Sequence, residues 1–381
     1  MKSAFGCLAM LFKSLLIFLG ILVVIAMFLG DADTSTQDTI QSKNSEYNFE
    51  IHFLDVGQGD SALVLCDGQA MLIDGGESND SSLIYAYLKE HSISHLDYIV
   101  ASHCHDDHIG GLPGALNYAT VGKALCPVTD YDSEEFDAFK KYLNKQNATI
   151  TVPNAGDTFA LGSSSFEIIA PQSNSENHND NSIVLRFTYG DTSFLFTGDA
   201  EYTEENQILS SGRNISSTVL KVGHHGSLSS TSNSFLKKVS PNYAVISVGR
   251  DNAYGFPDQL VLDDLREANI KVIRTDMQGT IICKSNGKDV LFYVERNANA
   301  NTVPTATPEP TATPTPALKT INKAAPEKTE ETYVLNKNTK KFHETWCSSV
   351  KKMKESNKSF FTGTRDEVIR KGYSPCGNCK P

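Results

Sequence analysis

A proline- and threonine-rich segment near the C-terminus constrains the fold of this 381-residue chain more than any other feature. Residues 297–331 read NANANTVPTATPEPTATPTPALKTINKAAPEKTEE. Proline at this density favours extended polyproline II and prevents a packed core. The segment therefore predicts a semi-rigid linker between two folded units, residues 48–296 and 332–381. The larger unit is long enough to bury a sizeable hydrophobic core.

The N-terminal residues predict a membrane anchor followed by a spacer. Two lysines precede an apolar run from residue 14 to 30, and two aspartates follow it. The run approaches the ~20 residues that span a bilayer, and positive charge before it places the N-terminus in the cytoplasm. We therefore expect a signal anchor at residues 1–30, a polar spacer at 31–47, and a single-pass membrane protein whose catalytic domain is extracellular. If the signal is cleaved, the protein is secreted.

Short apolar runs broken by glycine turns dominate the larger unit. The stretches YNFEIHFLDVGQGD, SALVLCDG and QAMLIDGG have the length and alternation of strands in a meander. Later strands alternate with helix-compatible stretches such as DQLVLDDLREAN, residues 258–269. Strands followed by strand–helix alternation, twice over, predict an α/β fold in which two sheets pack together with helices outside.

The stretch SHCHDDHIGG, residues 102–111, concentrates side chains that bind metals. His103 and His105 flank one residue at the end of an expected strand, so their imidazoles project the same way and can bind one ion. Asp107 and His108 follow in the turn before a helix and point to a second position. A chance polar turn is the alternative, but three histidines at this spacing argue against it. One short loop therefore predicts ligands for two metal ions.

Two distant strand ends have the character to complete the site. Asp199 ends the apolar stretch SFLFTGD, and His224 and His225 lie at the end of TVLKVGHHGS. A carboxylate that follows a strand can bridge two cations, and a histidine at another strand end can close the second position. We therefore expect these segments to meet the histidine loop.

These motifs, in this order, resemble the metallo-β-lactamase fold, specifically the hydrolase domain attached to the DNA-uptake channel of competent bacteria. The resemblance covers about residues 50–295. It implies a four-layer αββα sandwich with two divalent metal ions, zinc or manganese, between the sheets. The stretches that carry it are FLDVGQGDSALV, LIDGG, SHCHDDHIGGL, NDNSIVLRFTYG, FLFTGD, LKVGHHGS and YAVISVG. The ligands that it implies are His103, His105, Asp107, His108, Asp199 and His225, with His224 as the competing choice for the last.

The sequence departs from the family pattern at three places. Many members have a histidine ligand just before the strand NSIVLRF, where this chain has Asp180 and Asn181 as weaker candidate ligands. His178 can take the place of that missing histidine ligand only if its loop folds back towards the metal site. Phe256 stands where the pattern Tyr-Gly-His-Pro has histidine, and Cys104 replaces the usual proline in the metal loop. These departures indicate that one metal site is either weak or replaced by manganese-type chemistry.

The mechanism that fits these residues is metal-assisted hydrolysis. Two cations about 3.5 to 4 Å apart lower the pKa of a bridging water and neutralise charge on a phosphoryl or carbonyl oxygen. We expect Asp107 and Asp199 to hold the metals and orient the water. His224, if it is not a ligand, would donate a proton or hydrogen bond to the leaving oxygen. Asp55 and Asp60 either support the ligand imidazoles or cap backbone amides in their turn.

The smaller unit, residues 332–381, has a pattern typical of structural zinc. His343 and Cys347, with Cys376 and Cys379, offer one imidazole and three thiolates, a closed tetrahedral set. A unit this short buries little apolar surface, and a zinc ion would compensate for that. It resembles the small metal-binding domain at the N-terminus of the Ada DNA-repair protein and similar units attached to bacterial nucleases. A disulfide between Cys376 and Cys379 is the alternative.

Charge separates the two units. Residues 331–381 contain eleven Lys or Arg and five Asp or Glu, net +6, so residues 1–330 carry −17 of the total charge of −11. A basic domain on a long linker can hold DNA or an anionic envelope polymer near an acidic catalytic domain. A merely soluble, lysine-rich surface explains the same charge equally well.

The leading hypothesis is a membrane-anchored, extracytoplasmic hydrolase that uses two divalent ions to cleave phosphodiester bonds, with DNA as its substrate. One structural zinc is expected in the C-terminal unit, and no obligate protein partner is predicted. Two alternatives stay open. One is hydrolysis of a small ester, lactone or lactam by the same fold, and the other is a non-catalytic binding protein in which Asn181 and Phe256 mark a decayed metal site.

Overall fold

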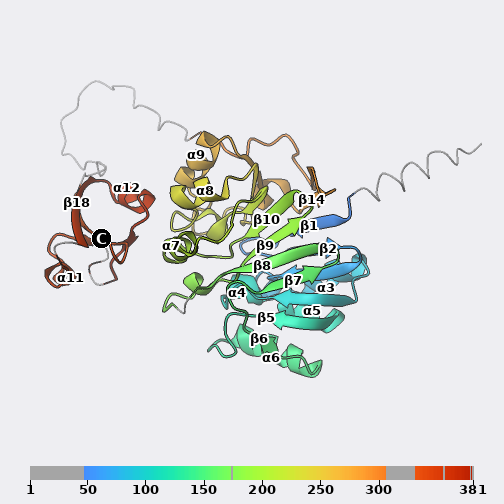
Figure 1. The fold of residues 1–381 in the computed structure, drawn as a ribbon. Coiled ribbons are helices and arrows are strands. Elements are labelled where there is room, and N and C mark those ends of the chain that lie inside the picture. The colour runs from blue at the N-terminus through green and yellow to red at the C-terminus, as the bar shows by residue number, and fades with distance from the viewer. Residues whose placement is uncertain (1–46, 173–174, 306–330, 355–356, 378, 380–381) are drawn as a thin grey trace, which may run out of the picture. The chain divides into compact units, whose positions relative to one another are not determined.

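The computed structural model describes the chain in five pieces, which are residues 47–172, 175–305, 331–354, 357–377 and 379. The predicted anchor at residues 1–30 lies outside the described residues, as do most of the predicted spacer and residues 306–330 of the predicted linker. In the described ranges, no helix has the length and hydropathy needed to cross a bilayer. Figure 1 shows two sheets in the larger part of the chain and a separate small sheet in the C-terminal part.

The first sheet has eight strands in the order β15-β14-β1-β2-β3-β4-β5-β6. Strands β1 to β3 are antiparallel neighbours, which confirms the predicted meander. Strands β3 to β6 run parallel, because helices connect them and return the chain to the same edge. The strands are β1 (Phe49–Phe53), β2 (Ala62–Cys66), β3 (Gln69–Ile73), β4 (His95–Val100), β5 (Thr120–Leu125), β6 (Ile150–Thr151), β14 (Ile281–Ser285) and β15 (Val290–Val294).

The second sheet has seven strands in the order β13-β12-β11-β10-β9-β8-β7. Thr192 pairs with Tyr189 at the end of the β9–β10 ladder, so a tight hairpin turn joins these two strands. Strands β10 to β13 are parallel. The strands are β7 (Thr158–Leu161), β8 (Ser164–Ala170), β9 (Val184–Tyr189), β10 (Thr192–Phe196), β11 (Val219–Lys221), β12 (Tyr243–Ile246) and β13 (Lys271–Arg274).

Helices form short connections and two outer layers. Helix α6 shows why the sequence forms them: Ser133 accepts a hydrogen bond from the Phe136 amide at its start, and the apolar side chains recur on one face. The helices are α3 (Ser81–Glu90), α4 (Asp106–Ile109), α5 (Leu112–Tyr118), α6 (Glu134–Lys145), α7 (Tyr202–Ser211), α8 (Asn233–Val239), α9 (Gln259–Glu267) and α10 (Thr275–Gln278), with 3-10 turns η1 (Ser78–Asp80), η2 (Asn179–Asn181) and η3 (Gly223–Gly226).

Three hydrophobic cores define the layers. Between the sheets lies an aromatic core, in which the ring of Phe49 stacks on Phe194 with centroids 4.8 Å apart. A second core, with Ile84 and Phe136, lies between the first sheet and α3, α5 and α6. A third, with Phe235, lies between the second sheet and α7, α8 and α9. The order helix, sheet, sheet, helix is the αββα sandwich that the resemblance predicted.

The C-terminal part forms its own four-stranded sheet in the order β18-β16-β17-β19. Val334, Phe342 and Val368 are buried in it. The sheet is small, with one two-residue strand, so its apolar core is limited. Its elements are β16 (Glu331–Asn336), β17 (Lys341–Glu344), α11 (Ser348–Lys351), β18 (Lys358–Gly363), α12 (Arg365–Arg370) and β19 (Ser374–Pro375).

Candidate metal centres

The histidine loop follows β4 and is held in place by two glycine-rich turns. The Asp60 amide donates to the Asp107 carbonyl at 3.0 Å, and the Gly75 amide donates to the His108 carbonyl at 2.6 Å. Gly59 has φ +147°, and a Cβ atom there would lie 2.5 Å from the Asp107 carbonyl oxygen. Only glycine permits so close an approach. The glycine turns of the sequence therefore fix the backbone of the metal loop.

Four predicted ligands form a compact group, which we call the four-ligand group: Asp107, His108, Asp199 and His225. Their ligand atoms all lie within 4.8 Å of one another. His108 Nε2 is 3.2 Å from Asp199 Oδ1, and His225 Nε2 is 3.1 Å from Asp107 Oδ2. The group joins the loop after β4, in the first sheet, to the ends of β10 and β11 in the second. The common edge of the two sheets therefore carries a candidate metal position.

The other oxygen of Asp199 faces a second set of imidazoles. His103 Nε2 lies 3.8 Å from Asp199 Oδ2 and 3.0 Å from His105 Nδ1. His224 Nε2 lies 3.6 Å from the same Asp199 oxygen. We call His103, His105 and His224 the three-histidine group. Asp199 thus presents one carboxylate oxygen to each group, as a bridging ligand would.

The two adjacent histidines of η3 reach different groups because of their backbone. His224 has φ 49° and His225 has φ 54°, both in the left-handed region that is unfavourable for non-glycine residues. Such strain is concentrated at functional sites. His225 is buried, whereas the His224 side chain is 21% exposed and lies 3.4 Å from Glu201 Oε1. Both competing candidates of the sequence therefore reach Asp199, on opposite sides.

Carboxylates and imidazoles stabilise each other's charge in this centre. Burial disfavours the charged form of His225, but the charges of Asp199 and Asp60 outweigh it and raise the pKa to about 10. Burial likewise disfavours ionised Asp199, but His108 and His225 outweigh it and hold its pKa well below the usual range. Burial and the charge of His108 lower the pKa of His103. The carboxylates are therefore anionic at neutral pH, as metal binding requires.

The residues present fit divalent cations. His108 Nε2 and Asp199 Oδ1 are buried and make no hydrogen bond within the described ranges, although they face each other. Buried polar atoms of proteins normally have a hydrogen-bond partner. Two adjacent ligand atoms without one are therefore suited to bind a metal ion. Imidazole and carboxylate donors suit zinc or manganese.

The structure turns both alternative ligands towards backbone groups. The Asn181 side-chain oxygen accepts from the Ser175 amide at 2.7 Å, and its amide donates to the Ser175 carbonyl at 2.9 Å. Asp180 Oδ1 accepts from the backbone amides of residues 201 and 204, each at 3.2 Å, at the start of α7. The His178 ring, in contrast, lies 6.3 Å from the His105 ring. The loop therefore does fold back, and it brings His178 towards the centre.

The structure also shows the surroundings of the other two residues that depart from the family pattern, Cys104 and Phe256. Cys104 is buried with its sulfur 3.9 Å from that of Cys126, in the core beneath the first sheet. The Cys104 side chain thus packs in the hydrophobic core. The Phe256 ring lies 5.7 Å from the His224 ring, so an apolar side chain covers His224 where the family pattern has a histidine.

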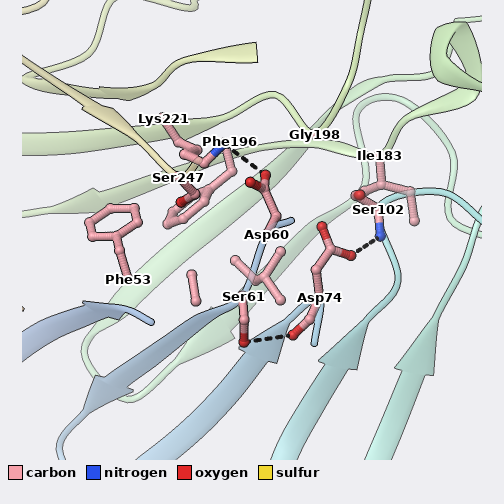
Figure 2. Close-up of a pocket in the computed structure, with 12 residues that line it drawn as sticks. Phe53, Asp60, Ser61, Asp74, Ser102, Ile183, Phe196, Gly198, Lys221 and Ser247 are labelled. Atoms are coloured by element: carbon pink, nitrogen blue, oxygen red, sulfur yellow. Dashed lines mark hydrogen bonds and ion pairs between the residues drawn. The ribbon is translucent and has the colours of Figure 1, made fainter. Parts of the chain in front are cut away.

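Sequence reasoning missed two buried residues beneath the centre. Asp74 Oδ2 lies 2.9 Å from His108 Nδ1, and its other oxygen accepts from the Ser102 amide at 2.7 Å (Figure 2). Asp74 directly follows β3, so the strand-end rule that identified Asp199 was a usable signal. Lys221 Nζ lies 2.7 Å from Asp60 Oδ2, and no pattern marked this lysine. Asp55 instead forms an ion pair with Arg296 at 2.7 Å, and its other oxygen accepts from the Gly57 amide at 3.5 Å, which is the backbone-capping alternative for this turn.

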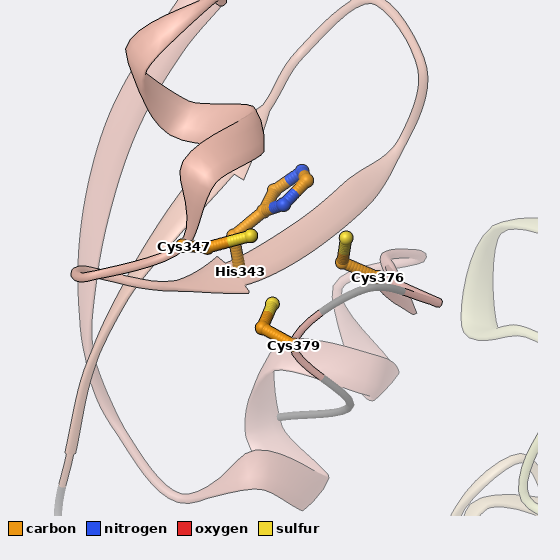
Figure 3. Close-up of side chains that lie close together, drawn as sticks. All are labelled: His343, Cys347, Cys376 and Cys379. Atoms are coloured by element: carbon orange, nitrogen blue, oxygen red, sulfur yellow. The ribbon is translucent and has the colours of Figure 1, made fainter.

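The C-terminal cluster has the composition predicted for zinc. The ligand atoms of His343, Cys347, Cys376 and Cys379 lie within 4.8 Å of one another (Figure 3). No disulfide joins any of the described cysteines. Both ring nitrogens of His343 are buried and without a hydrogen bond among the described residues, and burial and Lys341 lower its pKa, which favours the neutral ligand form. One imidazole and three thiols fit a closed, tetrahedral zinc site.

Comparison with known proteins gives a consistent result for the larger part of the chain. A family profile described as the metallo-beta-lactamase superfamily matches residues 54–250. ComE operon protein 3 of Bacillus subtilis is 30% identical over 251 residues, which are 61% of this chain and 32% of the relative. Competence protein ComA of Neisseria gonorrhoeae is 34% identical over 231 residues, 60% of this chain and 31% of the relative.

The chain thus spans about a third of the length of these curated relatives. Among solved structures, the metallo-beta-lactamase fold protein YhfI from Bacillus subtilis aligns with a TM-score of 0.41 at 14% identity. That alignment covers 62% of this chain and 100% of YhfI.

Proposed function

The chain belongs to the metallo-beta-lactamase superfamily, and on that premise we propose that it hydrolyses phosphodiester bonds in DNA with two divalent metal ions. Membership gives the reaction class, metal-dependent hydrolysis, and the proposal concerns the substrate and the residues. We further propose that the N-terminal residues anchor the protein in the membrane with its catalytic domain outside, and that a structural zinc stabilises the C-terminal domain.

The position of Asp199 carries the proposal. Its Oδ1 lies 3.2 Å from His108 and 3.7 Å from His225, while its Oδ2 lies 3.6 Å from His224 and 3.8 Å from His103. A single buried carboxylate that faces two sets of imidazoles supports two adjacent cation positions. The four-ligand group would hold one cation, and His103 and His105 with Asp199 would hold the other.

The bound cations would supply Lewis-acid activation of water and neutralise charge on the phosphoryl oxygens. Asp107 is part-exposed, with 28% of its side chain accessible, whereas the His108 and His225 rings are buried. Substrate therefore approaches the centre from the side of Asp107 and His224. The buried imidazoles orient the carboxylates from below.

His224 is suited to move a proton to the leaving oxygen. Its Nδ1 lies 3.2 Å from Ser229 Oγ and 3.4 Å from Glu201 Oε1. Burial acts to raise the pKa of Glu201, but the hydrogen bond and charge of His224 outweigh this and lower it. The Glu201 carboxylate faces Nδ1 of His224 and orients its ring, which is partly exposed on the substrate side. This is the arrangement that a general acid requires.

Two observations favour DNA as the substrate. One of the relatives is named as a competence protein, and another, from Haemophilus influenzae, as Recombination protein 2. The basic C-terminal region, net +6, supplies the positive charge that attracts a polyanion. Neither feature favours a small neutral ester, lactone or lactam.

DNA cleavage by the full chain loaded with manganese tests the proposal. We expect the wild type and His95→Ala to cleave DNA, because His95 is exposed at the start of β4 and its Nδ1 lies 2.8 Å from Thr120 Oγ1, in a different place from the predicted ligands. His103→Ala and Asp107→Ala should lose cleavage. Unchanged cleavage by either variant would contradict the proposal. Turnover of nitrocefin or a lactone with intact DNA favours the small-substrate alternative, and sub-stoichiometric metal favours a binding protein.

A further inference from the structure

A buried ion pair lies directly beneath the proposed metal centre. Lys221 Nζ is 2.7 Å from Asp60 Oδ2, and both residues are almost inaccessible, at 3% and 6% exposure. Lys221 also donates to the Val222 carbonyl at 3.0 Å. Figure 2 shows the pair together with Asp74 around one small pocket. The proposed mechanism gives Lys221 no role, and the sequence left open whether Asp60 supports a ligand imidazole or caps a backbone amide.

Asp60 is the point at which two ligands from different sheets are connected. It lies in the turn between β1 and β2 of the first sheet, and its amide holds the Asp107 carbonyl at 3.0 Å. Its side-chain Oδ1 lies 3.2 Å from Nδ1 of His225, which follows β11 of the second sheet. Asp60 therefore fixes the backbone of one ligand and the ring of another.

The ring of His225 faces two oxygens on one side. Its Nδ1 donates to the Ser247 carbonyl at 3.0 Å and lies 3.2 Å from Asp60 Oδ1, a buried oxygen that makes no hydrogen bond among the described residues. The opposite nitrogen, Nε2, faces Asp107 at 3.1 Å and is the atom that a bound cation would take. Carboxylates placed behind ligand histidines fix ring orientation in metal sites.

The cost of the pair argues for a role beyond stability. Removing a lysine and a carboxylate from water is expensive, and well-packed apolar residues of similar volume often stabilise a protein as much or more. This pair connects the two sheets at the one edge where metal ligands of both sheets converge. The position of the ion pair is therefore explained by the metal centre and not by the packing of the hydrophobic core.

We propose that Asp60 and Lys221 form a positioning pair, in which Asp60 holds Asp107 and His225 in register across the two sheets and Lys221 provides its counter-charge. The inference rests on the proposed metal centre and deepens it. Neither residue touches the substrate side. Replacing the pair should therefore lower the metal affinity of the four-ligand group.

The decisive variant replaces both charges together. Asp60→Leu with Lys221→Met keeps similar volumes and leaves no unpaired charge, so we expect thermal unfolding close to the wild type. We expect its Mn²⁺ affinity, measured on the full chain by the electron paramagnetic resonance signal of free Mn²⁺, to fall roughly 10- to 100-fold. A folded double variant with wild-type Mn²⁺ affinity would overturn the proposal, because the Ser247 carbonyl would then suffice.

Two further variants make the result unambiguous. Arg274→Met with Asp276→Leu removes an ion pair of 2.6 Å whose guanidinium also donates to the Thr302 carbonyl, and it should keep wild-type Mn²⁺ affinity. If the first double variant does not fold, Asp60→Asn decides, since it keeps the shape and removes the charge. Reduced Mn²⁺ affinity then supports the proposal, and wild-type affinity overturns it. A chain that binds Mn²⁺ but leaves DNA intact contradicts only the proposed function.

Discussion

The centre between the two sheets takes its ligands from three segments that lie between residues 103 and 225, whereas the C-terminal cluster takes all four from residues 343–379. The first contains only imidazoles and carboxylates, and three of its members, His105, Asp107 and His224, are partly exposed. The second contains three cysteines and one histidine, and most of it is buried. One arrangement leaves a route for substrate, and the other is closed.

This difference follows from what each part needs. The αββα sandwich has three hydrophobic cores and folds around its own apolar surface, so its ligands are available for chemistry. The C-terminal sheet is short, and a metal bound by cysteines would contribute to its folding directly. We therefore expect metal removal to inactivate the first region and to unfold the second.

The largest effect should come from the C-terminal cluster. Cys347→Ser, or chelation of zinc, should expose the backbone amides of β16 to β18, because structural zinc supplies roughly 10–16 kcal/mol in comparable sites. Hydrogen exchange followed by mass spectrometry measures this. Ser348→Ala, beside the cluster, should retain protection. Retained protection in Cys347→Ser would show that the small sheet folds without metal and would remove the contrast between the regions.

The next effect separates the two centres within one chain. Asp199→Ala should lose the metals of both imidazole groups, since each group faces one oxygen of this carboxylate, and DNA cleavage should fall to background. The C-terminal zinc should remain, so metal analysis should find it alone. Asp191→Ala, at the exposed β9–β10 turn, is the matched control. An ion retained between the sheets would mean that Asp199 does not bridge.

A smaller effect distinguishes the roles of the paired histidines. His224→Gln should lower kcat roughly 10²- to 10⁴-fold if His224 is a general acid, with metal content unchanged. His225→Gln should lower metal content itself, because His225 belongs to the four-ligand group. Metal analysis and single-turnover cleavage on the same samples separate the two results. Loss of metal from His224→Gln would instead make it a ligand.

The parts of this comparison that the sequence could predict share a physical basis. The spacing of His103 to His108 is local, and Asp199 and the two late histidines stand at strand ends, which parallel strands bring to one edge. The pairing of Lys221 with Asp60 depends on contact between two sheets across 161 positions of sequence, and a lysine within an apolar run gives no signal of it. The sequence could not predict the hydrogen bond between Asn181 and Ser175 either, because it depends on the conformation of the loop.

The smallest effect concerns buried carboxylates that lack the imidazole partners of the centre. Glu204 on α7 is as buried as Asp199, but burial and the charge of Asp180 raise its pKa well above the usual range. Its folded pKa exceeds the unfolded value of 4.5, so its contribution to stability is present below that value and is lost as pH rises through the folded pKa. Glu204→Gln removes this loss.

We therefore expect Glu204→Gln to unfold about 2–4 °C above the wild type at pH 8, the shift for roughly 1 kcal/mol in a domain of this size. The difference should close as the pH falls below 4.5, where the wild-type carboxyl becomes protonated in both states. Glu90→Gln, exposed at the end of α3, should show no shift. Thermal unfolding at the two pH values measures all three chains. A lower midpoint for Glu204→Gln at pH 8 would mean that this carboxylate is stabilised by its surroundings, as Asp199 is by its imidazoles.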